Sequence, residues 1–514
     1  MTTLLDLSDS SGEAHSDFPG AQVTKDDPRY RALVRGFNLR WVGQPKYVQV
    51  CGSAEQVRDA VQQALDAPTP LRVTVRGGGH CYEDFVSNND GGVIIDLSPL
   101  NGVYSPGEGY YVVEGGCTLW NVYTQLFKEY GVTVPAGSCY SVGAGGHVVG
   151  GGYGLLSRKY GLVIDYLYAV EVVTVTADRQ AVLTVVTRDE DDPVRRELFW
   201  AHQGGGGGNF GVVTKYWFKD LPKAPECAYV TTVAWEWADI GKAEFTQLVT
   251  NYGTFFEQNS GADSPYKDMF ALLHLSNQAA GQISLTVQNV GPDPDLIDTF
   301  LEAISPGGVS SQALRVPVGY LHASPPPEQT QYLPWLDATQ TLNGSGPPRR
   351  GKYKSAYMKR GFPPEQIEVL WRYLWEEKFN NSQALVQVDS YGCQINTVPS
   401  DATAVPQRSS IMKLQYQTYW TDEADDQQNL DWINGFYNAM YGPEGPVPDG
   451  TMDGCYVNYP DVDLKHWQLL YYGEQGYRRL QAVKARWDPL DVFNHQQSIE
   501  LPGKAQDGAA KSEG

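Results

Sequence analysis

Residues 137–154 read GSCYSVGAGGHVVGGGYG, and this glycine-rich stretch decides how the rest of the chain is interpreted. A second glycine-bearing stretch, residues 76–82 (RGGGHCY), follows directly after a strand-like run. Glycine has no Cβ, so backbone amides in such loops can come close to a phosphate group or a flat ring. An imidazole and a thiol beside these loops, here His80 and Cys139, are therefore candidate points of attachment for a cofactor.

Neither stretch matches a common nucleotide-binding motif. A strand, a glycine loop and a helix in succession suggest dinucleotide binding in general. However, the sequence at 76–80 is neither GxGxxG nor a Walker A loop, since it has no GK[ST]. Taken alone, His80 would be an ordinary surface histidine and Cys139 a small buried residue. The loops indicate a cofactor site only in combination with other motifs.

The composition limits the classes of partner. The chain has 514 residues, enough for a large core in two domains, and its formal net charge is -21. This charge disfavours nucleic acid and anionic membrane surfaces as partners. No run of about 18 apolar residues predicts a membrane span. The first 20 residues lack the basic and apolar regions of a secretory signal, so we expect a cytoplasmic protein.

The seven cysteines are irregularly spaced and never form a CxxC pair. This spacing is typical neither of a disulfide framework nor of a zinc site. We therefore expect reduced thiols and no metal. The sequence carries no signal for an oligomeric state.

The N-terminal half alternates strand-like and helix-like segments. Apolar positions 57, 60, 61, 64 and 65 predict an amphipathic helix, preceded by a capping box at residues 53–56. A second helix is expected over residues 118–130. The segments that predict strands are residues 47–50, 71–75, 93–97, 110–114 and 167–176.

After about residue 223 the chain becomes rich in aromatic residues and proline loops. A helix is expected over residues 370–378 and strands over 383–388 and 411–420, the last with Met412, Leu414, Tyr416 and Thr418 on one face. The expected organisation is a disordered N-terminus at 1–20, a first domain at 21–224, a second domain at 225–450, and a return to the first domain at 451–514.

Residues 204–208 are five consecutive glycines, followed by NFGVV. Such a run is costly in conformational entropy, which favours a loop that needs close backbone approach. A flexible linker is the alternative. Apolar, strand-like residues flank the run on both sides, and they disfavour a linker.

In combination, these motifs resemble the berberine-bridge-enzyme-like FAD-linked oxidases of the vanillyl-alcohol-oxidase superfamily. The stretch 137–154 is similar to the family's cysteine motif, and the resemblance covers nearly the whole chain after residue 20. It is closest to bacterial oxidases of sugars and natural products. Further matches are DLS at 96–98, GLVID at 161–165, LFW at 198–200, residues 205–213, DP at 488–489 and QSI at 497–499. The fold implied is α+β, with a two-domain architecture: an FAD-binding domain of the PCMH type and a substrate domain whose antiparallel sheet is covered by helices.

The resemblance implies that one FAD is attached at two points. His80 would bond the flavin 8α-methyl carbon and Cys139 the ring C6, which would leave an open cleft for bulky substrates. The redox chemistry is the cofactor's, and the protein orients and tunes it. A bond to Cys139 requires surroundings that favour the thiolate. The other matched cofactor positions are Arg76, Gly77, Gly78, Gly79, Cys81, Ser138, Val142, Gly143, Gly145, Gly146, His147, Gly151, Gly152, Tyr153, Gly154, Gly211, Val212, Tyr456 and Asn458.

The resemblance also implies a tyrosine base. Residues 456–459 (YVNY) match the family's Tyr-x-Asn-Tyr motif, whose second tyrosine, Tyr459, would remove the hydroxyl proton while hydride leaves for flavin N5. A phenol with a pKa of about 10 is a poor base at neutral pH, so a nearby cation or second phenol must assist it. The other matched active-site positions are Tyr153, Tyr391 and Gln415.

Some positions depart from the family pattern. Cys81 directly follows His80 and adds a second thiol that could react. Asp491 stands where many members carry Asn, which would alter a flavin contact. Cys393 stands where Gly is common, which would narrow the cavity. Val142 occupies a position linked to oxygen access, and there the chain resembles the oxidases and not the oxygen-blind dehydrogenases.

Three functions stay open. The first is an FAD-dependent oxidase that acts on an alcohol or hemiacetal hydroxyl of a sugar or secondary metabolite and reduces O2 to H2O2. The second is an oxidative cyclase of natural-product biosynthesis. The berberine-type base is a carboxylate, and its position here is Gln415, which cannot act as a base. A cyclisation that uses a tyrosine base stays open. The third is a non-catalytic binding protein, which the intact His80, Cys139 and Tyr459 disfavour.

Overall fold

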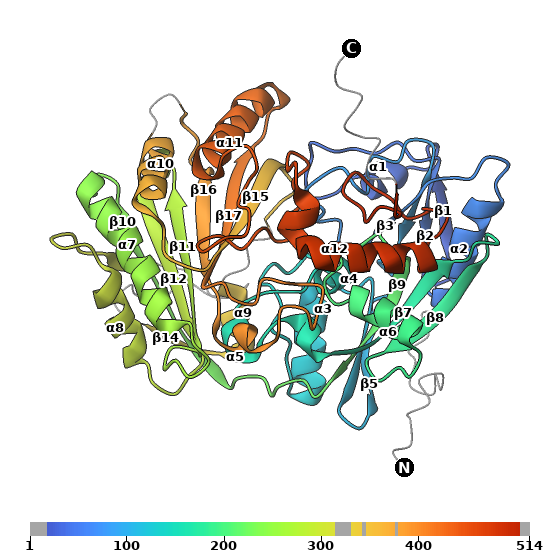
Figure 1. The fold of residues 1–514 in the computed structure, drawn as a ribbon, viewed down its shortest axis with the longest axis horizontal. Coiled ribbons are helices and arrows are strands. Elements are labelled where there is room, and N and C mark those ends of the chain that lie inside the picture. The colour runs from blue at the N-terminus through green and yellow to red at the C-terminus, as the bar shows by residue number, and fades with distance from the viewer. Residues whose placement is uncertain (1–17, 314–329, 342–345, 376–378, 504–514) are drawn as a thin grey trace.

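The computed structural model describes residues 18–313, 330–341, 346–375 and 379–503. Three sheets are arranged in two halves that lie side by side (Figure 1). The half built from the N-terminal segments carries two sheets, and the middle of the chain forms the third. Most of the segment expected to be disordered, residues 1–17, lies outside the described residues.

The first sheet has the strand order β1-β2-β4-β3. Strands β2 (Tyr47–Val50), β4 (Val93–Asp96) and β3 (Val73–Arg76) are parallel, and β1 (Ala21–Thr24) pairs antiparallel with β2. Parallel strands need a crossover, and α2 (Ala54–Asp66) provides it between β2 and β3. Because β3 ends at Arg76, the glycine stretch and His80 lie at the carboxyl edge of this sheet.

The second sheet is antiparallel, with the order β5-β6-β9-β7-β8. Strand β7 is buried along its whole length, and irregularities interrupt its register with β9. Gly211 lies just before β9 with its φ at +157°, and a Cβ there would lie 2.4 Å from the Val173 oxygen. The strands are β5 (Val103–Gly107), β6 (Tyr110–Glu114), β7 (Leu167–Val175), β8 (Ala181–Thr187) and β9 (Val212–Lys219).

The third sheet is also antiparallel, with the order β13-β10-β12-β11-β16-β17-β15, and β14 pairs with β10. Helices α7, α8, α10 and α11 cover it (Figure 1). The strands are β10 (Cys227–Glu236), β11 (Met269–Ser276), β12 (Gln282–Asn289), β13 (Gln312–Ala313), β14 (Gln331–Pro334), β15 (Arg350–Met358), β16 (Leu385–Ser390) and β17 (Met412–Trp420). The helices are α7 (Lys242–Asn259), α8 (Asp295–Ile304), α10 (Pro364–Leu374) and α11 (Asp426–Tyr441).

The C-terminal segment returns to the first half. Helix α12 (Trp467–Trp487) packs against α6 (Pro193–Ala201) and bends at Gly473, where φ is +66°. The remaining short helices are α1 (Tyr30–Leu33), α3 (Leu119–Gln125), η1 (Leu126–Tyr130), α4 (Ala144–Val149), α5 (Ser157–Tyr160), η2 (Val163–Tyr166), η3 (Gln278–Ala280), α9 (Trp335–Thr341), η4 (Cys393–Thr397) and η5 (Glu423–Asp425).

Most of the elements expected from the sequence are present. Ser53 caps α2 by accepting from the Gln56 amide, but the Gln56 side chain accepts from Gly52, so only half of the expected capping box forms. The helix expected over residues 118–130 is α3 followed by the π-helical turn η1. The helix expected over 370–378 begins earlier, at Pro364, and its last three residues lie outside the described ones.

The expected fold class is confirmed: the chain mixes helix and sheet, and an antiparallel sheet covered by helices forms the second half. The domain boundaries stay a prediction. In the described part of the chain, no helix combines the length and the apolar character needed to cross a bilayer.

Candidate active site

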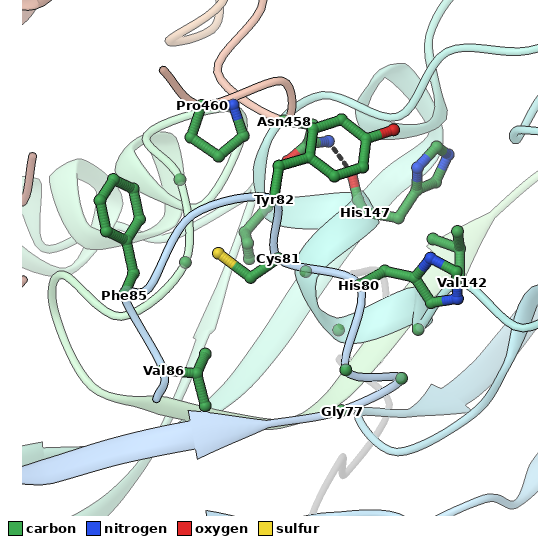
Figure 2. A pocket seen from close by; sticks show the side chains of 18 of the residues that line it. Gly77, His80, Cys81, Tyr82, Phe85, Val86, Val142, His147, Asn458 and Pro460 are labelled. Atoms are coloured by element: carbon green, nitrogen blue, oxygen red, sulfur yellow. Dashed lines mark hydrogen bonds between the residues drawn. The ribbon is translucent and has the colours of Figure 1, made fainter. Parts of the chain in front are cut away.

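A cavity of about 490 Å³ lies where the two halves meet. Its walls come from the edge of the first sheet, from both glycine stretches, from β11, β16 and β17 of the third sheet, and from two segments near the C-terminus. Figure 2 shows the loop that carries His80, Cys81 and Tyr82 facing Asn458 and Pro460 across this space. Residues distant in the sequence therefore share one site.

The two glycine stretches touch each other. A Cβ on Gly78 would lie 2.3 Å from the Gly143 nitrogen, so only glycine permits this approach. His80 lies within hydrogen-bonding distance of Ser141, with its Nε2 2.8 Å from the hydroxyl oxygen, and its ring stacks on Phe37. Burial lowers the pKa of His80 to about 4, so its imidazole is neutral at neutral pH. A neutral ring nitrogen is the form that can act as a nucleophile.

The cysteines near the site differ in their surroundings. Cys139 is partly buried and lines the cavity. Cys81 lines it too, but burial raises the pKa of its thiol to about 12. A thiol that stays protonated is a poor nucleophile, so the reaction considered for Cys81 is disfavoured. None of the seven cysteines, all within the described residues, forms a disulfide.

Bare glycine backbone forms much of the cavity wall. A Cβ on Gly146 would meet nothing within 4 Å, although this residue lines the cavity. Three residues of the five-glycine run, 206–208, line the cavity too, so the run is part of the site and not a linker. A flat ring and a diphosphate both need such accessible backbone, and these walls therefore fit FAD.

Substitution of Gly146 tests this fit. In the His80→Ala/Cys139→Ala background, where neither expected bond can hold the flavin, we expect Gly146→Ala to fold normally, because its methyl group meets no protein atom. Its flavin affinity should fall by roughly 5- to 150-fold, since overpacking costs about 1–3 kcal/mol. Flavin absorbance per chain and thermal unfolding measure the two effects. Gly450→Ala is the matched control, because its Cβ also meets nothing within 4 Å. Unchanged flavin content in Gly146→Ala would place the flavin elsewhere.

The C-terminal tail contributes residues that sequence reasoning missed. His495 stacks on Phe85, with ring centroids 4.3 Å apart, and its Nε2 lies 3.3 Å from the Gly207 oxygen. Burial lowers the pKa of His495 to about 3, which keeps the ring neutral. The sequence offered a signal, because His495 lies between the matched DP and QSI motifs.

Tyr459 is held by a buried ion pair. The Lys413 ammonium donates to its hydroxyl over 3.1 Å and lies 2.6 Å from a carboxylate oxygen of Asp389. Lys413 is 0% and Asp389 3% exposed. The expected assisting cation is thus present, and sequence reasoning did not identify it. Burial, and after it the Asp389 charge, nevertheless keep the pKa of Tyr459 well above its ordinary value.

Polar side chains extend this arrangement along the cavity wall. The Gln387 amide donates to Asp389 over 2.9 Å, and Gln417 donates to Gln387 over 3.1 Å. Tyr419 in turn donates to Gln417 over 2.9 Å. These contacts fix the orientation of each amide, so the wall presents a defined pattern of donors and acceptors.

The other expected catalytic residues have different positions. Gln415 lines the cavity and donates to the Tyr82 hydroxyl over 3.0 Å. Tyr153 lines it as well, and the Lys413 ammonium lies 4.7 Å from its ring centroid. Tyr391 does not line the cavity: it is fully buried, packs against Tyr153, and donates to the Gln407 carbonyl. A catalytic role for Tyr391 stays a prediction.

Asn458 connects the tyrosine motif to the second glycine stretch. Its side chain donates to the His147 carbonyl over 3.0 Å (Figure 2) and to the Tyr456 hydroxyl over 2.9 Å. The Gly137 amide donates to His147 Nε2, and burial lowers the pKa of this ring to about 4. The tyrosine motif and the cysteine motif are therefore joined by a hydrogen bond.

Most expected cofactor positions line the cavity, but Gly151 and Gly152 do not. Two positions expected to affect the site lie outside the cavity wall. Cys393 does not narrow the cavity, because it is buried outside the wall with its amide bonded to Ser260. Asp491 does not line the cavity either. It has φ +55°, a conformation that Asn and Asp adopt more readily than most residues, and it lies 3.2 Å from Lys484.

Comparisons with known proteins agree with this geometry. Residues 45–181 match the family model of the FAD binding domain, and residues 455–500 match that of berberine and berberine-like proteins. The aclacinomycin-N/aclacinomycin-A oxidase of Streptomyces galilaeus is 42% identical, over 94% of this chain and 90% of its own. The hexose oxidase of Chondrus crispus is 38% identical, over 92% and 94% respectively.

Solved structures show the same relationship. The flavoenzyme CrmK, involved in shunt product recycling in caerulomycin biosynthesis, superposes with a TM-score of 0.87 at 39% identity, over 94% of this chain and 99% of that one. A glycopeptide hexose oxidase complexed with teicoplanin superposes with a TM-score of 0.85 at 38% identity, over the same shares. The chain therefore belongs to the berberine-bridge-enzyme-like family and is an FAD-linked oxidoreductase that uses oxygen as acceptor.

Proposed function

We propose that this protein is an oxidase with FAD attached to both His80 and Cys139, and that Tyr459 is the base that removes the substrate's hydroxyl proton. The substrate is an alcohol or hemiacetal hydroxyl of a sugar or secondary metabolite. One observation carries the proposal. The Tyr459 phenol, bonded to a buried Lys413, stands at the same cavity that His80 and Cys139 line.

The chain's residues supply the acid–base chemistry. Bound FAD would accept the hydride from the substrate carbon and pass two electrons to O2, giving H2O2. The phenolate of Tyr459 takes the hydroxyl proton, so the substrate loses a hydride and a proton and becomes a carbonyl compound. Lys413 stabilises that phenolate through its hydrogen bond. Gln415 and Tyr82, bonded to each other, orient the hydroxyl-bearing substrate.

The cavity wall supports a hydroxyl-rich substrate. Gln387, Gln417 and Tyr419 form a continuous hydrogen-bonded row along it, and amides and phenols both donate to and accept from hydroxyl groups. Three of the relatives named above are, by their names, a hexose oxidase, a glycopeptide hexose oxidase and an oxidase of aclacinomycins. An oxidative cyclase with a carboxylate base is disfavoured, since Gln415 holds that position and its amide donates to Tyr82.

Acid denaturation tests the attachment. We expect the yellow colour to stay with the precipitated chain in the wild type and in His80→Ala and Cys139→Ala, because each single variant keeps one bond. In the double variant the colour should move to the supernatant. Release of the colour from the wild type would contradict covalent attachment, and retention in the double variant would point to a different attachment residue.

A further inference from the structure

A cluster of five charged side chains, all buried except the half-exposed Asp463, lies beside the active site and takes no part in the proposed chemistry. Five side chains form it: Glu83, Lys352, Lys354, Asp461 and Asp463. The Lys352 ammonium lies 2.6 Å from Glu83, 2.7 Å from Asp461 and 3.0 Å from Asp463. Lys352 is 2% exposed, and Glu83 and Asp461 are each 1% exposed. We call these residues the Lys352 cluster.

The cluster joins three segments that the sequence keeps far apart. Glu83 follows His80 by three residues, and Asp461 follows Tyr459 by two. Lys352 belongs to β15, the edge strand of the third sheet. A lysine of the third sheet therefore forms ion pairs with both the loop after the histidine and the loop after the tyrosine. Figure 2 shows the first two segments facing each other, with Tyr82 beside Asn458 and Pro460.

Further contacts hold the same two segments in place. Tyr353, next to Lys352, stacks on Tyr82 with ring centroids 3.6 Å apart and an angle of 12°. The Asp461 amide donates to Tyr471, and its carbonyl accepts from Gln497 over 2.7 Å. Lys352 and Tyr353, at consecutive positions of β15, thus contact the His80 loop, and Lys352 and Lys354 contact the Tyr459 loop. The loops can move relative to each other only if these contacts break.

Stability alone does not explain such a cluster. Burying several charges carries a large desolvation penalty, and apolar side chains of similar size commonly stabilise a fold equally well or better. What buried ion pairs can supply is a fixed geometry, since a bidentate or shared contact permits one arrangement. We infer that Lys352 is a positioning residue, which holds the His80 loop and the Tyr459 loop at a fixed separation across the cavity.

The assignment of roles to the two loops rests on the function proposed above, but the test does not need a substrate. In Lys352→Met, Glu83 keeps only a 3.4 Å contact with the Val462 amide, whereas Asp461 keeps Lys354 at 2.7 Å. The melting temperature of the holoenzyme should therefore fall. In Lys352→Met/Glu83→Gln the isolated carboxylate is gone, so we expect a melting temperature within about 2 °C of wild type.

Hydrogen exchange of the holoenzyme is the deciding measurement. We expect the amides of residues 79–86 and 457–464 to exchange at least about tenfold faster in the double variant, although its melting temperature is restored. The visible circular dichroism of the flavin should change with them. Arg350→Met is the matched control: Arg350 lies on the same strand, but its carboxylate partner is Asp426 on α11, so both loops should exchange as in wild type.

The outcomes separate positioning from stability. Wild-type exchange in the double variant would overturn the inference and leave the cluster a structural feature only. Equally fast exchange of both loops in Arg350→Met would overturn it as well, because the loss of any ion pair on β15 would then be enough to loosen the loops. A failure of the tyrosine base assignment would show in Tyr459→Phe kinetics instead, without any change in exchange, so the two proposals fail independently.

Discussion

A Tyr459→Phe variant is expected to reduce its flavin about 100- to 10,000-fold more slowly than wild type, with substrate affinity nearly unchanged. General acid–base groups contribute about this factor, and the phenyl ring fills the same space without the oxygen that accepts the proton. Anaerobic rapid mixing with the sugar or glycoside that gives most H2O2 in a panel measures the rate constant directly. The substitution removes the proton acceptor and its hydrogen bond from Lys413, whereas the packing of this ring on Tyr82 and Tyr456 is kept.

The pH dependence of flavin reduction provides a second test of Tyr459 as the base. Because burial and the Asp389 charge keep the pKa of Tyr459 well above its ordinary value, the phenol is mostly protonated at neutral pH. The reactive phenolate therefore increases with pH, and the wild-type rate constant should rise roughly tenfold per pH unit between about pH 7 and 9. In Tyr459→Phe this rise should be absent.

Tyr252→Phe serves as the matched control for both measurements. Tyr252 is fully buried in the half that carries the third sheet, and its hydroxyl donates to the Val388 carbonyl and does not line the cavity. Its rate and pH profile should follow those of the wild type. A Tyr459→Phe variant that keeps the wild-type rate and slope would remove Tyr459 as the base.

The sequence predicted the parts of the site that depend on local signals. His80 and Cys139 could be identified because glycines surround them and each follows a strand-like run, and the structure places both at one cavity. Likewise, the amphipathic pattern before β3 predicted α2 nearly to its ends. Short-range patterns of this kind record what the backbone must do within one loop or one helix.

The parts that were missed depend on contacts between distant residues. Lys413 lies in a strand of alternating residues, where a lysine normally indicates a solvated face, yet this face points toward the cavity and Lys413 is fully buried. Its partner Asp389 comes from the neighbouring strand, and strand pairing was not predictable. The position of Tyr391 was not predictable either. Its motif suggested an active-site role, but the direction of its side chain, which the sequence does not specify, takes the hydroxyl to Gln407.

A Lys413→Met variant is expected to combine a large loss of rate with a large loss of stability. Removal of the ammonium leaves the Asp389 carboxylate buried without its ionic partner, and breaking such a pair costs about 3–5 kcal/mol. The phenolate of Tyr459 also loses its hydrogen-bonded cation, which should slow flavin reduction by about 100- to 1,000-fold. Denaturant unfolding and rapid mixing measure the two effects.

The neighbouring substitution Asp389→Asn should act on the pH profile in the opposite direction. The Asp389 charge raises the pKa of Tyr459, so its removal lowers that pKa and moves the alkaline rise in rate to lower pH. Lys413→Met removes a positive charge and should move the rise to higher pH. Both variants lose stability, because each leaves one buried charge unpaired. Opposite pH shifts with similar stability losses therefore support an electrostatic role for the pair, whereas shifts of the same sign would contradict it.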